Sequence, residues 1–309
     1  MKLSNGSLQA VFIVVTILLS NCNVGSNETP NPDSINQEST SDTELELPQK
    51  RIVYQIPEMD NVITHKGVIY HSTNGLDLKA DIYLPPSKED NVEVPLVILV
   101  NDYPDSIVNN VWGCDQKDLK LFVSWGELIA ASGMAAVAYQ SQFSFSETDS
   151  LINFLSENAE KYRIDMDRLC VFGASANTLA AQSLLENDDL KIKCGILYYG
   201  ILLTPDLKYY AAIDSAANMY GFYWKDLRPV NSIPSNIPLL VTKAGKDQFE
   251  IVSKTTDHFV SEAIKSNANL TYIHYPEGQH DFDILDNTKT SKLIIRQTID
   301  FLTTHLLEE

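Results

Sequence analysis

Ser175, Asp247 and His280 are the residues of this 309-residue chain whose types and order best fit nucleophilic catalysis. A serine hydroxyl is a poor nucleophile until a neutral imidazole takes its proton, and the imidazole needs a carboxylate to fix its tautomer and to stabilise its charged form. The acid follows the serine by 247 − 175 = 72 residues, and the histidine follows the acid by 280 − 247 = 33 residues. Such a set can perform acyl transfer through the serine, provided that the fold brings the three side chains together.

The sequence around Ser175 predicts a buried strand, an abrupt turn and a helix. Residues 168–181 read RLCVFGASANTLAA. At such a turn the serine hydroxyl points out above a sheet, and the next N–H groups belong to a helix N-terminus, where an oxyanion meets donors and a favourable dipole. Because strand and helix nearly collide, the residues two before and two after the serine must be small. Gly173 satisfies this requirement, whereas Asn177 stands where glycine is usual. Taken alone, the pattern also fits a structural N-cap serine after a buried strand.

Asp247 and His280 each lie in a loop that follows a predicted strand. Asp247 belongs to KAGKDQ, after the apolar run 238–242, and His280 belongs to PEGQHDF, after the run 270–275. Gly-Lys-Asp-Gln is also good turn chemistry, so Asp247 could instead stabilise a turn. Lone histidines are usually structural or exposed, and we interpret the remaining ones in that way: His65, His71, His258, His274 and His305. We expect His274, inside the last strand, to be a packed ring.

These three segments resemble the α/β-hydrolase superfamily over about residues 75–307, and most nearly its esterase and dienelactone-hydrolase-like branches. The serine turn is similar to the superfamily's nucleophile elbow, the turn at Asp247 to its Gly-x-Asp turn, and the loop at His280 to its Gly-x-His-x-Phe motif. The resemblance implies a Ser175 nucleophile, a His280 base, an orienting Asp247 and a first oxyanion donor in the N–H of Ala176. It further implies hydrolysis of a small carboxylic ester through an acyl-serine, with no metal or organic cofactor.

The second oxyanion donor is less clearly indicated, because residues 101–106 read NDYPDS where many esterases carry His-Gly-Gly-Gly or His-Gly. Pro104 has no N–H. The donor would therefore be the N–H of Asp102 or Tyr103, or the Tyr103 hydroxyl, as in some prolyl-oligopeptidase-like relatives. A peptidase of that type is one alternative function. A binding protein that kept the fold but lost activity is another, indicated by Asn177 and the loop without glycine.

Residues 201–236 are too long for a simple connection between two sheet strands, and insertions here form lids over the active site in this superfamily. The segment is rich in aromatic residues, among them Tyr209, Tyr210, Tyr220, Phe222, Tyr223 and Trp224. We predict that the last four of these line the substrate pocket. Packing of the rings between the insertion and the domain is an equally good interpretation.

The rest of the chain predicts one α/β domain from about residue 51 to 309. Two alternating segments, 62–70 and 76–84, flank Thr73-Asn74-Gly75, which is a hairpin signal. The continuous apolar run 95–100 is typical of a strand buried on both faces of a parallel sheet. Further strands are predicted at 135–139, 195–199, 238–242 and 270–275, and helices at 119–131, 147–159, 252–265 and 291–307. We therefore expect a mostly parallel mixed sheet with helices on both faces, the α/β-hydrolase fold with a small lid insertion.

The N-terminus predicts export. Lys2 and the short apolar run 11–19 fit a signal peptide over residues 1–22. Leu19-Ser20-Asn21-Cys22 resembles a bacterial lipobox, which implies lipidation of Cys22 and attachment to a membrane in the periplasm or at the outer-membrane surface. An ordinary signal peptide or a single N-terminal anchor are the alternatives, and both also export the domain. Residues 23–50 are polar and predict a disordered tether.

Charge and cysteine content limit the possible partners. The chain has 23 Lys and Arg against 41 Asp and Glu, a net charge of −18, so a nucleic-acid partner is not expected. The cysteines form no Cys-x-x-Cys pair, so no metal site is expected. Cys170 and Cys194 each begin a predicted strand, and we expect them to be buried and free rather than paired.

Overall fold

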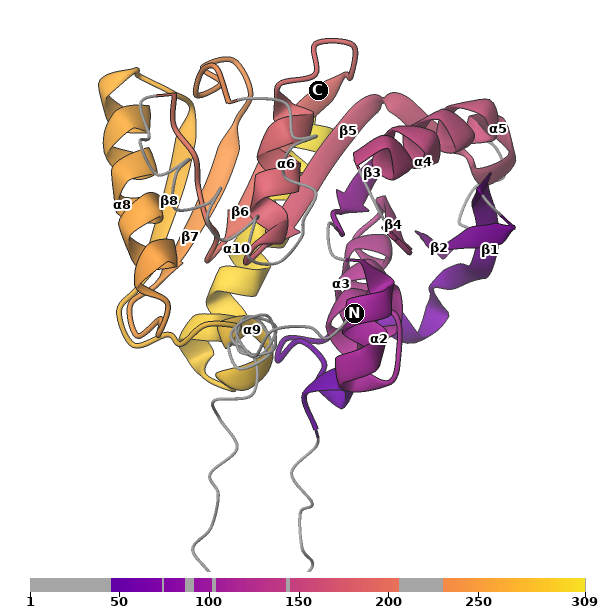
Figure 1. The fold of residues 1–309 in the computed structure, drawn as a ribbon, viewed down its shortest axis with the longest axis horizontal. Coiled ribbons are helices and arrows are strands. Elements are labelled where there is room, and N and C mark those ends of the chain that lie inside the picture. Colours follow the sequence, from indigo (N-terminus) through magenta and orange to yellow (C-terminus); the bar gives the residue numbers. More distant parts are fainter. Residues whose placement is uncertain are drawn as a thin grey trace, which may run out of the picture.

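The computed structural model describes residues 46–73, 75–86, 92–101, 104–142, 145–205 and 230–308, which build a sheet covered by helices on both faces (Figure 1). The predicted export segment, Cys22 and the tether as far as residue 45 lie outside the described residues. Leu47–Gln49 forms a 3₁₀ helix, η1, and Leu47 packs against the core, so these residues of the predicted tether belong to the folded domain. In the described part of the chain, no helix combines the length and apolar character needed to cross a membrane.

The sheet has eight strands in the order β1-β2-β4-β3-β5-β6-β7-β8. β1 and β2 pair antiparallel, β2 and β4 pair antiparallel, and all other neighbours are parallel. The strands are β1 (Ile63–Thr73), β2 (Leu76–Leu84), β3 (Val94–Leu99), β4 (Ala135–Tyr139), β5 (Ile164–Ala174), β6 (Ile192–Tyr198), β7 (Leu239–Ala244) and β8 (Leu270–Tyr275). The predicted mixed, mostly parallel sheet is confirmed.

Helices cover both faces of the sheet (Figure 1). The helices are α2 (Asp105–Trp112), α3 (Lys120–Ala131), α4 (Phe145–Glu157), α5 (Ala159–Tyr162), α6 (Asn177–Leu185), α8 (Glu250–Lys265), α9 (Phe282–Leu285) and α10 (Lys289–Leu306), with further 3₁₀ turns η2 (Pro57–Asn61) and η3 (Gln116–Asp118). Apolar residues of α4, α6 and α8 share one buried cluster, and those of α3, α9 and α10 share another. Burying both faces in this way explains why the central strands read as continuous apolar runs.

Three local features differ from the sequence-based expectation. β5 begins at Ile164 because the segment before Arg168 pairs with the start of β3 and is followed by a register shift. The helix expected at 147–159 ends at Glu157, and a separate short helix, α5, follows it. Helix α2 was not predicted, because its eight residues follow a proline and lie within the polar loop after β3.

Cys170 and Cys194 lie opposite each other on the neighbouring strands β5 and β6. Both side chains are fully buried and neither forms a disulfide. Burial raises the pKa of the Cys170 thiol, and Cys194 raises it further. The expectation of buried free cysteines is therefore confirmed.

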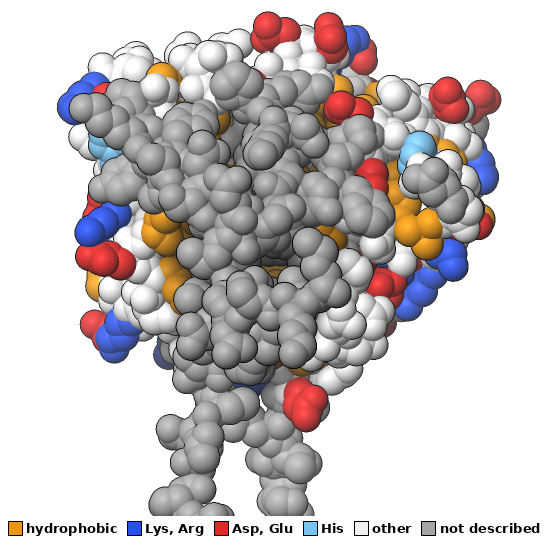
Figure 2. Space-filling model, viewed as in Figure 1, with side chains coloured by type: hydrophobic (Ala, Val, Ile, Leu, Met, Phe, Trp, Pro, Cys, Tyr) orange, Lys and Arg blue, Asp and Glu red, His pale blue; other side chains and the backbone are white. Residues whose placement is uncertain are grey.

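Charged side chains of both signs alternate around the margin of the face in Figure 2, with patches of hydrophobic surface between them. Exposed ion pairs in the described part of the chain include Lys191 with Asp167 and Lys254 with Glu250. Exposed pairs of this kind contribute about 0–1 kcal/mol each to stability, so the buried clusters provide most of it.

Candidate active site

Ser175 forms the turn between β5 and α6 in a left-handed backbone conformation, with φ 56°. This conformation costs a non-glycine residue about 1–3 kcal/mol, so the surrounding contacts must hold it. The Ser175 N–H donates to the carbonyl of Tyr198 at 2.9 Å, and the Ser175 carbonyl accepts from the Thr178 hydroxyl at 2.6 Å. The predicted abrupt turn is therefore present and is fixed from both sides.

The strand and the helix approach each other closely at Gly173. A Cβ placed there would lie 2.7 Å from the carbonyl oxygen of Asn177 and 2.8 Å from the Cβ of Ala181. Asn177 contributes backbone atoms to this contact, and its own side chain is buried. The asparagine in place of the usual glycine is thus compatible with the turn.

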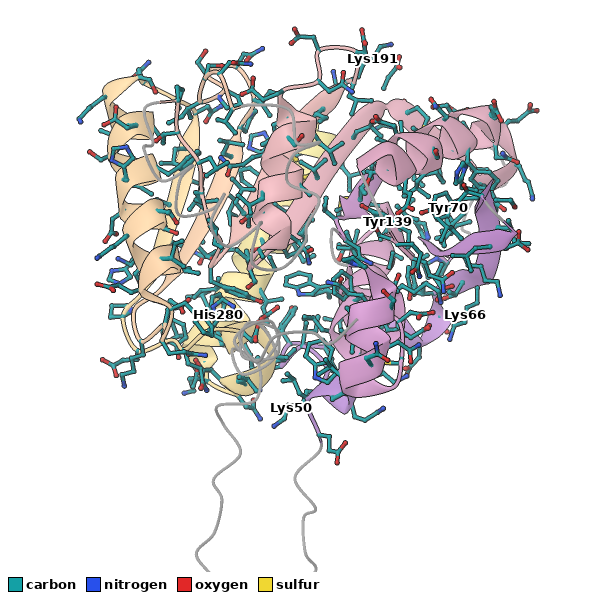
Figure 3. All side chains as sticks on the ribbon, in the orientation of Figure 1. Lys50, Lys66, Tyr70, Tyr139, Lys191 and His280 are labelled. Atoms are coloured by element: carbon teal, nitrogen blue, oxygen red, sulfur yellow. The ribbon has the colours of Figure 1, made fainter. Side chains whose placement is uncertain are left out.

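The structure brings Ser175, His280 and Asp247 together. His280 Nε2 lies 2.8 Å from Ser175 Oγ, and His280 Nδ1 lies 2.7 Å from Asp247 Oδ2. The other carboxylate oxygen of Asp247 accepts the N–H of Phe249 at 2.9 Å. The side chains of His280 and Asp247 are only 2% and 0% exposed, so water does not compete for this contact. Figure 3 shows His280 beside α9.

The loops that carry the acid and the histidine are bonded to each other. The Lys246 N–H donates to the carbonyl of Gly278 at 2.8 Å. A Cβ at Gly245 would lie 2.3 Å from the carbonyl oxygen of Pro276, so only glycine permits this approach. The backbone thereby sets the distance between Asp247 and His280 before any side-chain contact is considered.

The pKa of His280 is raised from its ordinary value. Burial alone lowers this pKa because it disfavours the charged ring, but the carboxylates of Asp281, Asp247 and Asp283 raise it by a larger amount. The surrounding carboxylates therefore stabilise the charged form of the His280 ring.

Two of these carboxylates were not predicted as site residues. Asp281 Oδ1 lies 4.0 Å from His280 Nε2. Asp283 is buried and accepts the Tyr199 hydroxyl at 2.7 Å and the indole N–H of Trp125 at 2.8 Å. Burial raises the pKa of Asp283 to about 6, although the Tyr199 hydrogen bond lowers it. The stretch HDFD, with two acids directly after His280, was the available sequence signal.

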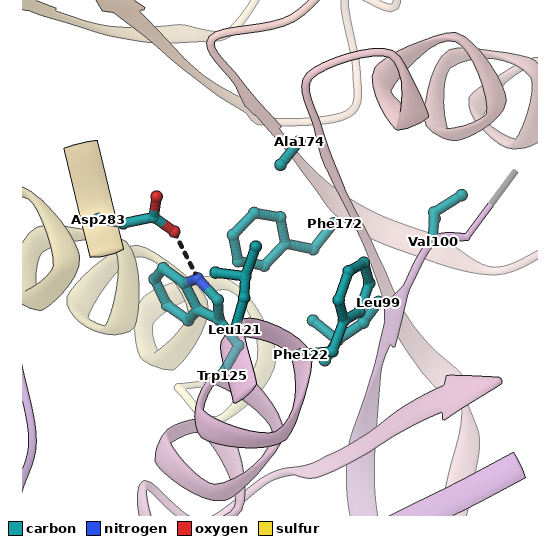
Figure 4. Close-up of a pocket in the computed structure, with 8 residues that line it drawn as sticks. All are labelled: Leu99, Val100, Leu121, Phe122, Trp125, Phe172, Ala174 and Asp283. Atoms are coloured by element: carbon teal, nitrogen blue, oxygen red, sulfur yellow. Dashed lines mark hydrogen bonds between the residues drawn. The ribbon is translucent and has the colours of Figure 1, made fainter. Parts of the chain in front are cut away.

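A small apolar cavity of about 30 Å³ lies next to the serine turn (Figure 4). Its lining consists of Leu99, Val100, Leu121, Phe122, Trp125, Phe172, Ala174 and Asp283. Ala174 directly precedes Ser175, and Leu99 and Val100 directly precede the loop of the predicted second oxyanion donor. Asp283 adds a carboxylate to an otherwise apolar wall.

The predicted oxyanion donors are only partly described. Ala176 lies at the start of α6, where the first N–H groups have no intrahelical acceptor. Asp102 and Tyr103 lie outside the described residues, so their role stays a prediction. On the far side of that loop, Asp105 is buried and accepts the N–H groups of Gln116 at 2.6 Å and Ser141 at 2.7 Å.

The described ends of the predicted lid are anchored on α6. The Leu203 N–H and carbonyl bond the side chain of Gln182 at 2.9 and 3.0 Å, and Leu203 and Val230 pack against Leu179. The aromatic residues proposed to line the pocket, Tyr220, Phe222, Tyr223 and Trp224, lie outside the described residues. The helix that follows Ser175 therefore also holds both ends of this insertion.

The other histidines lie away from these contacts. His65 packs edge-on against Tyr162, and His305 against Phe301. His274 corrects one expectation, because its ring is exposed on the edge strand β8 and stacks beside Tyr272 instead of being packed in the core. Within the described ranges, no group of three histidine, cysteine or acidic side chains is arranged to hold a metal ion.

The strand order, the helices on both faces and the serine turn together define the α/β-hydrolase fold. The sequence matches no protein-family model and shows no significant similarity to a curated protein sequence. Solved esterase structures are nevertheless similar in fold. The thermophilic esterase Est2 from Thermogutta terrifontis matches with a TM-score of 0.59 and 18% identity, covering 80% of this chain and 93% of Est2.

Two further esterases match at similar levels. LipW from Mycobacterium marinum gives a TM-score of 0.57 at 14% identity, covering 79% of this chain and 82% of LipW. Esterase B from Lactobacillus rhamnosis gives a TM-score of 0.55 at 12% identity, covering 81% of this chain and 88% of esterase B. At these identities the likeness concerns the fold.

Proposed function

We propose that this protein is a serine hydrolase that cleaves small carboxylic esters through an acyl-serine intermediate. The observation that carries the proposal is the continuous contact from Ser175 Oγ through the His280 ring to Asp247, at 2.8 and 2.7 Å, with the side chains of His280 and Asp247 buried. Geometry of this kind lets the ring accept the serine proton while the carboxylate stabilises the resulting charge.

In the proposed reaction, His280 Nε2 takes the Ser175 proton as Oγ attacks the ester carbonyl. The N–H of Ala176 stabilises the tetrahedral oxyanion, and the imidazolium then returns the proton to the leaving alkoxide. A water molecule, deprotonated by the same nitrogen, attacks the acyl-serine. The bond between the acyl carbon and Ser175 Oγ then breaks, the imidazolium returns the proton to Oγ, and the carboxylic acid is released. Asp247 holds the ring orientation and stabilises the imidazolium.

The small cavity beside Ala174 supports a short acyl group as the substrate's acid part. Its walls are mainly apolar, and at about 30 Å³ it has room for only a few heavy atoms. Est2, whose fold is similar, has been solved with propionate and with butyrate bound. We therefore place acetate to butyrate esters ahead of long-chain esters.

Hydrolysis of p-nitrophenyl acetate by the full-length protein and by Ser175→Ala tests this function. Activity in the parent that is lost in the variant supports it, and equal rates in both would reject Ser175 as the nucleophile. Asp247→Asn is expected to reduce the rate by about 10³–10⁴-fold, because the ring loses the carboxylate that orients it. Asp257→Asn, an exposed acid paired with Lys243, is the matched control and should retain the parent rate.

The same assay separates the alternative functions. A peptidase would cleave peptide substrates faster than esters in a parallel panel. A folded protein with no Ser175-dependent turnover of any ester or peptide would indicate a binding role. The contact between Ser175 and His280 favours turnover over that last possibility.

We also propose that the chain is exported and anchored by lipid on Cys22, as its lipobox-like sequence suggests. Metabolic labelling with a radioactive fatty acid tests this proposal. The label should be incorporated by the parent protein and absent from Cys22→Ser, and equal labelling of both would reject it.

A further inference from the structure

Asp281 is a carboxylate near His280 Nε2, and the proposed reaction gives it no role. Its Oδ1 lies 4.0 Å from His280 Nε2, which is the nitrogen that faces Ser175 Oγ at 2.8 Å. Asp247 lies at the opposite nitrogen, Nδ1. The ring is therefore flanked by a carboxylate at each end, and only the one at Nδ1 is required to orient it.

The backbone holds Asp281 in place at some cost. Its φ of 57° and ψ of 33° are left-handed, a conformation that aspartate and asparagine tolerate better than most residues. Its carbonyl accepts the N–H groups of Ile284 at 3.0 Å and Leu285 at 2.9 Å, which starts α9. The side chain is thus fixed beside His280 and does not swing freely into solvent.

Asp281 differs from Asp247 and Asp283 in keeping part of its side chain exposed, although burial raises its pKa. Its side chain is 14% exposed, compared with 2% for His280 and 0% for Asp247. Asp283, the third acid near the ring, is buried and bonded to Tyr199 and Trp125. Of these three carboxylates, Asp281 is the one that a bound substrate can approach.

The surroundings of His280 are negatively charged. The described groups that raise the pKa of His280 are all carboxylates, namely Asp281, Asp247 and Asp283, and the whole chain carries a net charge of −18. The half-buried ring of Phe249 packs edge-on against His280 at 4.9 Å. A carboxylate and an aromatic ring beside one histidine are the partners that organic cations prefer.

We propose that Asp281 is a specificity-determining residue that makes the site favour esters with a cationic group near the scissile bond and disfavour anionic ones. The proposal rests on the proposed ester hydrolysis. A carboxylate about 5–7 Å from the substrate charge, in surroundings of effective dielectric constant about 40, gives about a seven- to seventeenfold preference for the cation over its neutral isostere.

The experiment compares two acetate esters of nearly equal shape, acetylcholine and 3,3-dimethylbutyl acetate, in which carbon replaces the charged nitrogen. Acid release is followed by pH-stat titration at about pH 8, where Asp281 is ionised. The parent should give a kcat/KM ratio of about 7–17 in favour of acetylcholine. Asp281→Asn should bring the ratio close to one, because asparagine keeps the size and the left-handed backbone but lacks the charge. Asp300→Asn, which removes an exposed acid on α10, should leave the ratio unchanged.

A second readout separates a charge effect from a structural one. In Asp281→Asn the acid limb of p-nitrophenyl acetate hydrolysis should move to lower pH, because His280 loses one of the carboxylates that stabilise its charged form. In the parent, raising the ionic strength from about 0.02 M to about 0.5 M should reduce the preference for acetylcholine. This salt test requires no variant, so it holds even if Asp281→Asn fails to fold.

The proposal would be overturned if the parent showed no preference for acetylcholine or if the preference persisted in Asp281→Asn. A preference that did not change with ionic strength would also overturn it. These outcomes leave the proposed function intact whenever p-nitrophenyl acetate is hydrolysed in a Ser175-dependent manner. If no such hydrolysis occurs, the proposed function fails first and the specificity proposal falls with it.

Discussion

The hydroxyl of Tyr199 donates a hydrogen bond of 2.7 Å to Oδ1 of Asp283, a residue 84 positions later in the chain. Both side chains are buried, and the Tyr199 ring also contacts the ring of His280 at 4.9 Å. The bond therefore connects the end of β6 to α9, the short helix that begins directly after the histidine loop.

Removing only this hydroxyl, in Tyr199→Phe, should lower the free energy of unfolding by about 1–3 kcal/mol, because the buried carboxylate of Asp283 loses one of its two side-chain donors. Urea denaturation measures the change. Tyr272→Phe is the matched control, since Tyr272 is 37% exposed, and it should stay within about 0.5 kcal/mol of the parent. Equal stability of Tyr199→Phe and the parent would mean that Trp125 alone satisfies Asp283.

The stability of the protein should decrease as the pH rises from about 4 to about 7. Burial raises the pKa of Asp105 to about 7, even though the Gln116 and Ser141 N–H groups lower it, and burial raises the pKa of Asp283 to about 6. Between the ordinary pKa and these raised values, the folded state retains protons that the unfolded state has lost. The free energy of unfolding therefore falls by a few kcal/mol in all as the pH rises through this range.

Urea denaturation at a series of pH values tests this slope, and Asp105→Asn should make it shallower. Asp300→Asn, an exposed acid, should leave the slope of the parent unchanged. A parent whose stability is constant or increases over this range would contradict the raised pKa values of the two buried acids.

Ester hydrolysis should decline in acid with a midpoint above the ordinary histidine pKa of about 6.5. The base must be neutral, and the carboxylates around His280 raise its pKa despite the opposing effect of burial. The pH profile of kcat/KM gives the midpoint, with His274→Gln as a control because that ring is exposed on β8. Activity that stays flat down to about pH 5 would exclude His280 as the base.

The thiols of the folded domain should differ sharply in reactivity. Cys114 is partly exposed, although burial and nearby acids raise its pKa, whereas Cys170 and Cys194 are fully buried. A chromogenic thiol reagent should modify Cys114 slowly in the native protein and should reach the other two only after unfolding. The native reaction should disappear in Cys114→Ser. Rapid labelling of the native Cys114→Ser variant would show that Cys170 or Cys194 is accessible. Failure of these two thiols to react after unfolding would show that they are not free.

Much of the scaffold was predictable because its signals are local. The apolar run at β3, the alternation in β1 and β2 and the small residues around Ser175 each reflect a requirement that neighbouring residues impose. Strand β8 and strand β4 have the predicted bounds for the same reason. Helix α2 was not predicted because its eight residues follow a proline in a polar loop. Its first residue, Asp105, accepts the N–H groups of Gln116 and Ser141, contacts that the local sequence does not indicate.

The sequence by itself determined which residues could do chemistry: Ser175, Asp247 and His280 stand in the order and the loops that an α/β-hydrolase requires. Only the tertiary structure decided that their side chains meet, that Asn177 is accommodated beside Gly173, and that Asp281 and Asp283 surround the same ring. The reason is physical. The position of a residue between predicted strands indicates which loop carries it. Hydrogen-bond distances and charge interactions, by contrast, depend on how strands that are distant in sequence align within the sheet.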